Sequence, residues 1–253
     1  MAVTTFSSDP VFISELACAR RGGPLVAVAG ICGGAGASTL TFLLAYAAAQ
    51  ASGNSSGAPV LCCDTGGPTS GLALYAGAAA PRSLPGLADH LAAGGALTQT
   101  PFVEGPAGMR LLAGAPLFTG FGDSNMVRKI LADARAAHGM TVVDCGTLQR
   151  PADQIALSQA THVLWMAPAT DSGVRRAART FAVAPPLAAQ ELVVARCEHS
   201  ERTAPMRALT ALAETRGTQL LLLPHIPDLL DGTPDEAVAV AQVALQALAG
   251  VLR

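Results

Sequence analysis

Lysine is almost absent from this chain, in which Lys129 is the only one. Charged residues make up 13% of the sequence, and the formal net charge is −2. Charges that are so few and so balanced provide no overall attraction to DNA or to anionic lipid, which argues against functions that need a strongly basic surface. No uninterrupted apolar run approaches the roughly 18 residues that indicate a membrane span, so we expect no integral membrane segment.

Paired cysteine motifs are absent as well. No two of the six cysteines have Cys-x-x-Cys spacing, and most of them lie in apolar, strand-like runs. We therefore interpret them as reduced thiols of a cytoplasmic protein. The first residues include Asp9 and Glu15 and contain no long apolar core, so we expect no signal peptide. The cysteines are Cys18, Cys32, Cys62, Cys63, Cys145 and Cys197.

What the chain does have is a regular alternation of short apolar runs and helix-like segments. Hydrophobic residues make up 51% of the sequence, enough to bury a large core. Several runs are apolar on both faces, which is typical of parallel strands covered by helices. The alternation predicts an α/β fold, namely a doubly wound, mostly parallel sheet of about seven strands with helices on both faces. The predicted strands are Leu25–Ala29, Val60–Asp64, Arg110–Ala113, Thr141–Asp144, His162–Ala167, Glu191–Ala195 and Gln219–Leu223. The predicted helices are Ser38–Gln50, Leu84–Ala93, Ser124–His138, Ala152–Gln159, Ser172–Ala182, Pro205–Arg216 and Pro234–Leu252.

The domain organisation follows from the absence of an internal repeat and of a linker signature. We expect residues 1–23 to form an N-terminal arm, with a short helix around Val11–Arg20, and residues 24–253 to form a single domain. Helix starts are predicted from capping residues: Asp123 or Ser124 for one helix, Asp171 for another, and Thr233 with Glu236 for the last.

The most informative motif is the glycine-rich segment Ile31–Thr39, which lies between a predicted strand and a predicted helix. A strand, a glycine-rich turn and a helix form the usual context of a phosphate-binding loop, because the backbone N–H groups and the helix dipole favour an anion. The usual loop has a lysine just before its Ser or Thr, and here that residue is Ala37. This favours a nucleotide-binding fold with weak or absent hydrolysis; the alternative is a turn that only packs the strand on the helix. The predicted nucleotide-binding residues are Gly33, Gly34, Ala35, Gly36, Ala37, Ser38 and Thr39.

The order of the motifs resembles that of the ParA/MinD superfamily of P-loop proteins, roughly from Leu25 to Asp228. Within it, the loop Cys32-Gly-Gly-Ala-Gly-Ala-Ser-Thr39 is most similar to the CpaE/TadZ branch, which is linked to Tad pilus assembly and often has alanine in place of the loop lysine. The run Val60–Asp64, followed by Gly-Gly-Pro, resembles the second strand and switch I of the family. Thr141–Gly146 resembles its Walker B segment and switch II.

The resemblance implies particular ligands and roles. It implies ATP or ADP with Mg²⁺, and Ser38 and Asp144 would hold the Mg²⁺ through water. Asp64 would be the catalytic residue that positions the attacking water. Cys32 replaces the signature lysine of active relatives, so the resemblance favours no ATPase activity or a very weak one. Ala195 lies where relatives commonly have an asparagine that reads adenine.

Simpler interpretations of these residues stay open. Asp64 and Asp144 are also typical of carboxylates that cap a turn at a strand end. Arg150 is either a substitute for the missing lysine charge or an exposed loop residue. The cysteines of the loop and of the two neighbouring strands are either ordinary core residues or a metal or redox site (Cys32, Cys63 and Cys145). A basic cluster on one helix is either a solvated face or a contact with a partner or DNA (Arg175, Arg176 and Arg179).

The leading hypothesis is a MinD/ParA-like pseudo-ATPase, or a very slow ATPase, that forms a homodimer. It would act as a localisation or assembly scaffold for a pilus or secretion system, in the cytoplasm and recruited to a membrane-associated complex or a cell pole through partners. The alternatives are an active ATPase that uses arginine in place of lysine, a DNA-binding partition protein, and a structural subunit with an empty nucleotide pocket. The charge balance argues against DNA as a partner.

Overall fold

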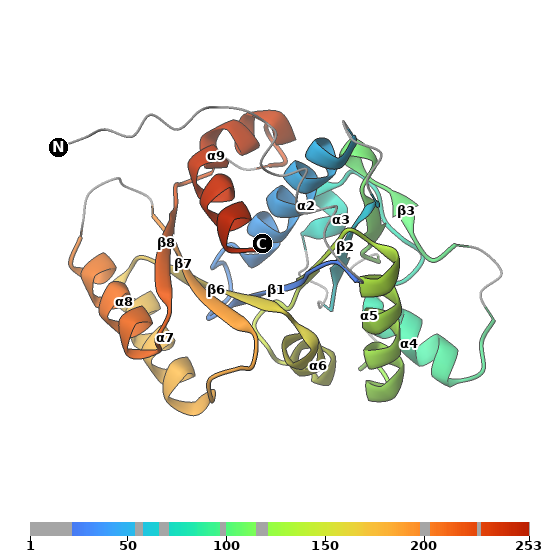
Figure 1. Cartoon of the computed structure of the whole chain (residues 1–253), viewed down its shortest axis with the longest axis horizontal. Helices are drawn as coiled ribbons and strands as arrows, with labels where there is room; N and C mark the ends of the chain where they lie inside the picture. Colours follow the sequence, from blue (N-terminus) through green and yellow to red (C-terminus); the bar gives the residue numbers. More distant parts are fainter. Residues whose placement is uncertain are drawn as a thin grey trace.

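The computed structural model describes residues 22–53, 58–65, 71–96, 100–114, 121–197, 203–226 and 229–252. The described part of the chain contains one eight-stranded sheet, with the strands in the order β3-β4-β2-β5-β1-β6-β7-β8 (Figure 1). All neighbouring strands are parallel except β3, which is antiparallel to β4. The strands are β1 (Leu25–Gly30), β2 (Val60–Asp64), β3 (Val103–Glu104), β4 (Arg110–Leu112), β5 (Met140–Asp144), β6 (His162–Pro168), β7 (Gln190–Arg196) and β8 (Gln219–Leu223).

Helices cover both faces of the sheet, as the sequence predicts. One face carries α2 (Ala37–Gly53), α3 (Leu72–Tyr75) and α9 (Pro234–Val251), and the other carries the remaining α-helices (Figure 1). The α/β, doubly wound, mostly parallel architecture is therefore confirmed. The helices of the second face are α4 (Leu84–Ala92), α5 (Ser124–Ala137), α6 (Pro151–Gln159), α7 (Asp171–Val183) and α8 (Ala204–Thr215).

The central strand β1 shows why the sequence folds into two layers of core. All six of its residues are buried, and their side chains alternate between the faces. Val26 and Val28 pack in the core beneath α2 and α9, whereas Leu25, Ala27 and Ala29 pack in the core beneath α4, α5 and α6. The run is apolar at every position because neither face of a central parallel strand meets water.

The helix starts agree with the capping predictions in two cases and differ in one. Asp123 accepts a hydrogen bond from the Met126 N–H (2.9 Å), and Thr233 and Glu236 form a capping box at the start of α9. The prediction of Asp171 as a cap is wrong, because the Thr170 hydroxyl accepts from the Gly173 N–H (3.1 Å). Asp171 is instead the first helical residue, where its charge favours the helix dipole.

Three short elements were not predicted: β3, α3 and the 3₁₀ helix η2 (Pro106–Gly108). Strand β3 has two residues and α3 has four, and neither is long enough to show a hydrophobic period. The expected helix at Val11–Arg20 and the Gly-Gly-Pro segment after β2 lie outside the described residues. Within the described parts of the chain, none of the helices combines the length and the apolar character that a bilayer crossing needs.

Candidate functional site

The glycine-rich loop lies at the carboxyl end of β1, where the order of strand addition reverses. Strands β2 and β4 lie on one side of β1, and β6, β7 and β8 lie on the other. In open α/β sheets, ligands bind in the crevice outside the carboxyl ends of the strands at such a switch point. The loop then leads directly into α2, whose first turn contains Ser38 and Thr39.

Backbone hydrogen bonds hold the start of the loop against β6 and the segment that follows β5. The Gly30 N–H donates to the Gly146 carbonyl (2.7 Å), and the Ile31 N–H donates to the Met166 carbonyl (3.0 Å). Gly34 and Gly36 have positive φ values of 72° and 98°, a conformation that disfavours any residue with a side chain. Gly33 and Gly34 are exposed and have open space where a Cβ would lie. The loop backbone is therefore fixed at its base and accessible at its tip.

Ser38 and Asp144 meet at the base of this loop. The Ser38 hydroxyl donates to the Asp144 carboxylate at 2.5 Å, and the Gly146 N–H donates to the other carboxylate oxygen at 2.9 Å. Burial raises the pKa of Asp144, whereas these two hydrogen bonds act in the opposite direction. A hydroxyl and a carboxylate side by side are hard oxygen donors of the kind that suits Mg²⁺, which keeps several of its own waters. The oxygens of Ser38 and Asp144 thus fit a Mg²⁺ ion as its ligands, directly or through water.

Asp64 is brought to the same edge of the sheet. It is the last residue of β2 and lies in register opposite Asp144, the last residue of β5. Both carboxyl residues are buried, with exposed fractions of 2% and 1%. The next residue, Thr65, donates both its N–H (3.0 Å) and its hydroxyl (2.9 Å) to the Asp144 carbonyl. The structure therefore brings Asp64, Asp144 and Ser38 to the same edge of the sheet.

A third buried carboxylate, Asp153, was missed by the sequence analysis. It lies in the first turn of α6 and accepts a hydrogen bond from the Arg150 N–H (2.8 Å). Burial raises its pKa, while its interactions with Thr65 and Arg150 act in the opposite direction. The negative charge of Asp153 also contributes to the raised pKa of Asp144. The available signal was an acidic residue two positions after Pro151, which is typical of a helix start.

Arg150 is half-buried rather than exposed, and its guanidinium lies toward the carboxyl end of β2, where it donates to the Thr65 carbonyl (3.4 Å). A second arginine, Arg196 at the end of β7, was not predicted to take part in the site, and it touches the loop directly. Its guanidinium donates to the Gly34 carbonyl at 2.7 Å.

Two of the three cysteines of the possible metal or redox site behave as core residues, and the third, Cys32, is only partly buried. Cys63 and Cys145 are buried, and burial raises the pKa of both thiols, so they stay protonated. Across the described residues, no group of three or more histidine, cysteine or acidic side chains is placed to hold a metal ion. The structure does not support the alternative of a cysteine metal site in this part of the chain.

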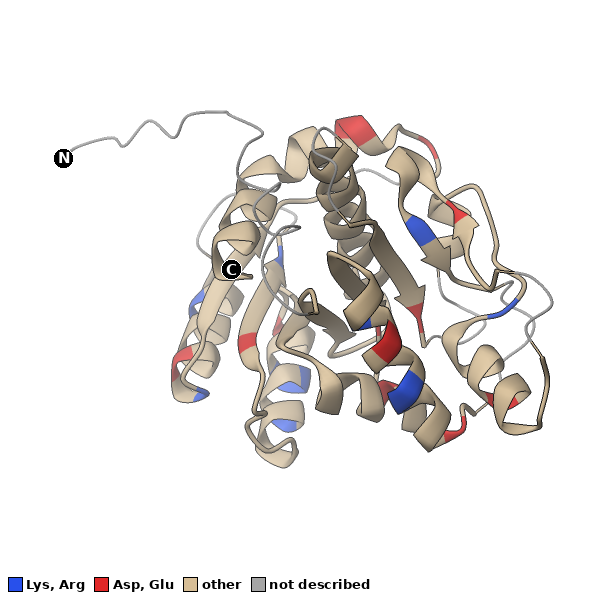
Figure 2. Ribbon diagram, turned by 45° about the vertical axis from the view of Figure 1, so that its right-hand side comes forward, with Lys and Arg blue, Asp and Glu red and all other residues tan. Residues whose placement is uncertain are grey.

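The basic cluster on α7 is exposed, as expected of a solvated helix face; its residues are Arg175, Arg176 and Arg179. Basic residues occur on several elements, with acidic residues among them (Figure 2). Ala195 is fully buried in β7.

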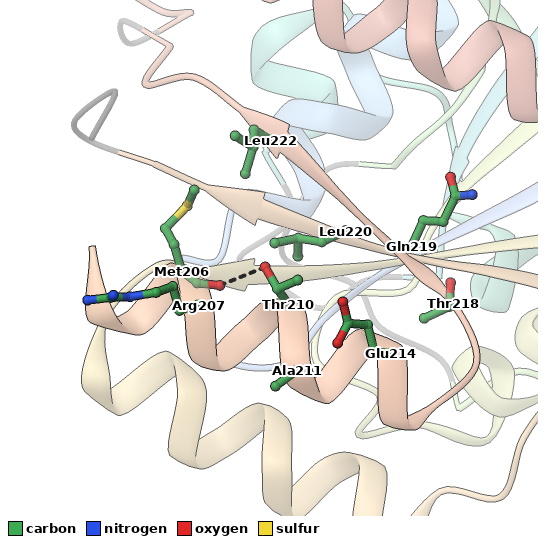
Figure 3. A pocket seen from close by; sticks show the side chains of 9 residues that line it. All are labelled: Met206, Arg207, Thr210, Ala211, Glu214, Thr218, Gln219, Leu220 and Leu222. Carbon is green, nitrogen blue, oxygen red and sulfur yellow. Dashed lines mark hydrogen bonds between the residues drawn. The ribbon is translucent and has the colours of Figure 1, made fainter. Parts of the chain in front are cut away.

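A separate groove of about 570 Å³ lies between α8 and the edge strand β8 (Figure 3). Its two charged side chains, Arg207 and Glu214, extend from α8 about two helical turns apart. None of the predicted site residues lines it. Its lining residues are Met206, Arg207, Thr210, Ala211, Glu214, Thr218, Gln219, Leu220 and Leu222.

Comparison with known proteins finds similarity in fold. No protein-family model and no curated protein matches the sequence. Among solved structures, a ParA family ATPase from Chlorobium tepidum superposes with a TM-score of 0.70 at 13% identity, covering 92% of this chain and 100% of that one. The MinC:MinD cell division complex of Aquifex aeolicus gives a TM-score of 0.68 at 18% identity, over 91% of this chain and 95% of that one. Cobyrinic acid a,c-diamide synthase from Mycobacterium smegmatis, solved with a bound ATP analogue and magnesium, gives 0.58 at 19% identity, over 90% of this chain and 93% of that one. The chain thus has the P-loop fold of ParA- and MinD-type ATPases.

Proposed function

We propose that this protein binds ATP or ADP with Mg²⁺ at the glycine-rich loop and acts as a positioning scaffold of the ParA/MinD type that hydrolyses nucleotide very slowly or not at all. The observation that carries the proposal is the contact between Ser38 and Asp144 beneath the loop, at the switch point of the sheet. In this proposal the N–H groups of residues 33–39 bind the phosphates, and Ser38 and Asp144 hold Mg²⁺ through water. Asp64 orients the water for any residual hydrolysis.

Slow turnover follows from the charges in the loop. The side chains at the two lysine positions are Cys32 and Ala37, so no lysine neutralises the charge that develops on the transferring phosphate. Removing one preorganised donor from such a site typically lowers kcat by about 10²–10³-fold. Ground-state binding depends less on it, because Mg²⁺ and the backbone N–H groups supply positive charge of their own. A protein that binds nucleotide without hydrolysing it rapidly suits a scaffold.

We further propose that the protein forms a homodimer and recruits pilus or secretion machinery to a membrane-associated complex or a cell pole. The support is the loop sequence, which matches the CpaE/TadZ branch in having alanine before the serine. The exposed tip of the loop, at Gly33 and Gly34, provides the face on which a second copy would meet the nucleotide.

The proposal predicts that nucleotide stabilises the folded protein. At 100 times the dissociation constant, Mg²⁺-ATP or Mg²⁺-ADP is expected to add about 2.7 kcal/mol to the free energy of unfolding. The measurement is the melting temperature with ATP, ADP and GTP, each with Mg²⁺ and each with EDTA. An absence of any shift at millimolar nucleotide would support the structural subunit with an empty pocket instead.

Asp144 provides a sharper version of this test. We expect Asp144→Asn to lose the Mg²⁺-dependent part of the nucleotide stabilisation, up to the roughly 2.7 kcal/mol expected for the wild type. The nucleotide-free variant should be as stable as the wild type or more stable, since burial raises the pKa of Asp144 and its charge therefore opposes folding above that pKa. Calorimetry with and without Mg²⁺-ATP measures both effects.

The matched control is Asp133→Asn, which removes an exposed carboxylate from α5. That variant should keep the full response to Mg²⁺-ATP. If Asp144→Asn also keeps it, the assignment of Asp144 as the magnesium residue is wrong.

A further inference from the structure

Arg196 contacts the glycine-rich loop, although no sequence motif predicts it there. It comes from the end of β7, 162 positions away from Gly34 in the sequence, and donates from Nη1 to the Gly34 carbonyl at 2.7 Å. The side chain also runs beside Gly36, where an added Cβ would lie 3.5 Å from the Arg196 Cδ. The aliphatic part and the guanidinium therefore follow the loop from Gly36 to Gly34.

The charge of this guanidinium is not neutralised by the described part of the protein. Arg196 forms no ion pair with any of the described residues, in contrast to Arg216, which pairs with Glu191. The Nε of Arg196 is buried and has no hydrogen-bond acceptor within the described ranges. A guanidinium has five N–H donors in a fixed fork, and a buried donor without an acceptor costs free energy. These donors suit an anion that arrives with its own acceptor oxygens.

The surroundings leave this side chain room to adjust. A cavity of about 70 Å³ lies beside it, between the ends of β6 and β7 and the start of α8. Arginine is also the side chain best suited to bidentate contact with phosphate oxygens. Because the loop carries no lysine, Arg196 is the cation that the described residues bring to Gly34 and Gly36.

From this geometry we propose that Arg196 takes the place of the missing loop lysine. In the free protein it ties the Gly34 carbonyl to β7, and when nucleotide binds it provides the positive charge that faces the phosphates. This proposal rests on the nucleotide-binding function proposed above and names the residue that makes such binding workable without lysine. It also predicts that recognition depends on the number of phosphates rather than on the base.

The test compares the affinities of the wild type and of Arg196→Gln for Mg²⁺-ATP, Mg²⁺-ADP and AMP by calorimetry. Glutamine retains an N–H donor for the Gly34 carbonyl and removes the charge. A unit charge about 6 Å from a phosphate at an effective dielectric constant near 20 corresponds to roughly 100-fold in affinity, so we expect a loss of 10- to 100-fold for ATP. The loss should be smaller for ADP and smallest for AMP. Arg196→Lys, which keeps the charge, should recover most of the ATP affinity.

The control variant is Arg175→Gln, which removes an exposed arginine from α7 and the same unit of net charge. It should bind ATP as the wild type does. The melting temperatures of the nucleotide-free variants show whether each one is folded. If Arg196→Gln is folded and binds ATP as tightly as the wild type, the role of Arg196 is wrong while the nucleotide function stands. If the glutamine and lysine variants lose ATP, ADP and AMP equally, Arg196 shapes the loop and does not face the phosphates, which also overturns the proposal. If the wild type binds no nucleotide, both proposals fail.

Discussion

Replacing Glu191 by alanine is expected to lower the free energy of unfolding by about 3–5 kcal/mol, because it leaves a buried arginine without its partner charge. Glu191 and Arg216 form a bidentate ion pair. Arg216 Nε lies 2.5 Å from Glu191 Oε2, and Arg216 Nη2 lies 3.1 Å from Glu191 Oε1. The Arg216 side chain is only 5% exposed and the Glu191 side chain only 8%. Since small domains are stable by about 5–15 kcal/mol in total, this loss is a large part of the stability.

Glu191 does more than balance the charge of Arg216. Its carboxylate also accepts hydrogen bonds from the Trp165 indole N–H and from the Leu187 N–H, both at 2.7 Å. The Arg216 guanidinium lies 4.8 Å from the ring centroid of Phe181 and 5.5 Å from that of Trp165. One carboxylate thus joins β6, β7 and the end of α8, at the end of the sheet away from the loop.

Chemical denaturation of Glu191→Ala measures this effect, with Arg207→Ala as the control. Arg207 is an exposed arginine of α8, so its removal should change stability by less than about 0.5 kcal/mol. The double variant Glu191→Gln with Arg216→Met should regain much of the loss, because it removes both charges and keeps an acceptor for Trp165. A single Glu191→Ala variant as stable as the wild type would show that solvent screens the pair more than its burial indicates.

The parts of the fold that the sequence predicts well are those with a local signal in consecutive residues, such as an apolar run or a capping box. Strand β5 and helix α9 are examples, since one is apolar at consecutive positions and the other begins with a capping box. Strand β3 was missed because Val103 and Glu104 carry no period, and only their antiparallel pairing with β4 makes them a strand. The choice between Thr170 and Asp171 as a cap depends on backbone angles, because both side chains are suitable acceptors.

The residues of the candidate site also fall into two groups, those that a sequence motif predicts and those that it does not. The resemblance to P-loop proteins implies that Ser38 and Asp144 approach each other, although they lie 106 positions apart, because it identifies one with the phosphate-binding loop and the other with the Walker B strand. No local motif marks Arg196, whose contact with Gly34 depends on the neighbouring positions of β6 and β7 in the sheet. Asp153 is also missed, because an acidic residue in the first turn of a helix usually remains exposed. Residues that act through tertiary neighbours are therefore absent from a prediction based on motifs.

Replacing Ala37 by lysine is expected to raise the rate of Mg²⁺-dependent ATP hydrolysis by about 10²–10³-fold, the effect of restoring one preorganised charge at the transferring phosphate. Ala37 is the first residue of α2 and is 8% exposed, directly before Ser38. A lysine there would occupy the position that holds the lysine of a usual phosphate-binding loop, directly before the Ser or Thr. Affinity for ATP should rise less than the rate does, because the added charge acts mainly on the charge that develops in the transition state.

The control for this variant is Ala37→Met, which adds a side chain of similar length without charge. Steady-state phosphate release with Mg²⁺ and with EDTA measures both variants, and Asp64→Asn in the Ala37→Lys background tests whether the restored activity depends on the predicted catalytic carboxylate. If lysine and methionine at position 37 give the same slow rate, the missing charge is not what limits hydrolysis. Hydrolysis would then be limited by another feature of the site, and the buried carboxylates are the first candidates. Burial raises the pKa values of Asp144 and Asp153. Any proton retained on Asp144 weakens the binding of Mg²⁺ to this carboxylate. In that case the rate of Ala37→Lys should increase as the pH rises through the raised pKa of Asp144, whereas a rate limited only by the missing lysine should not change over the same range.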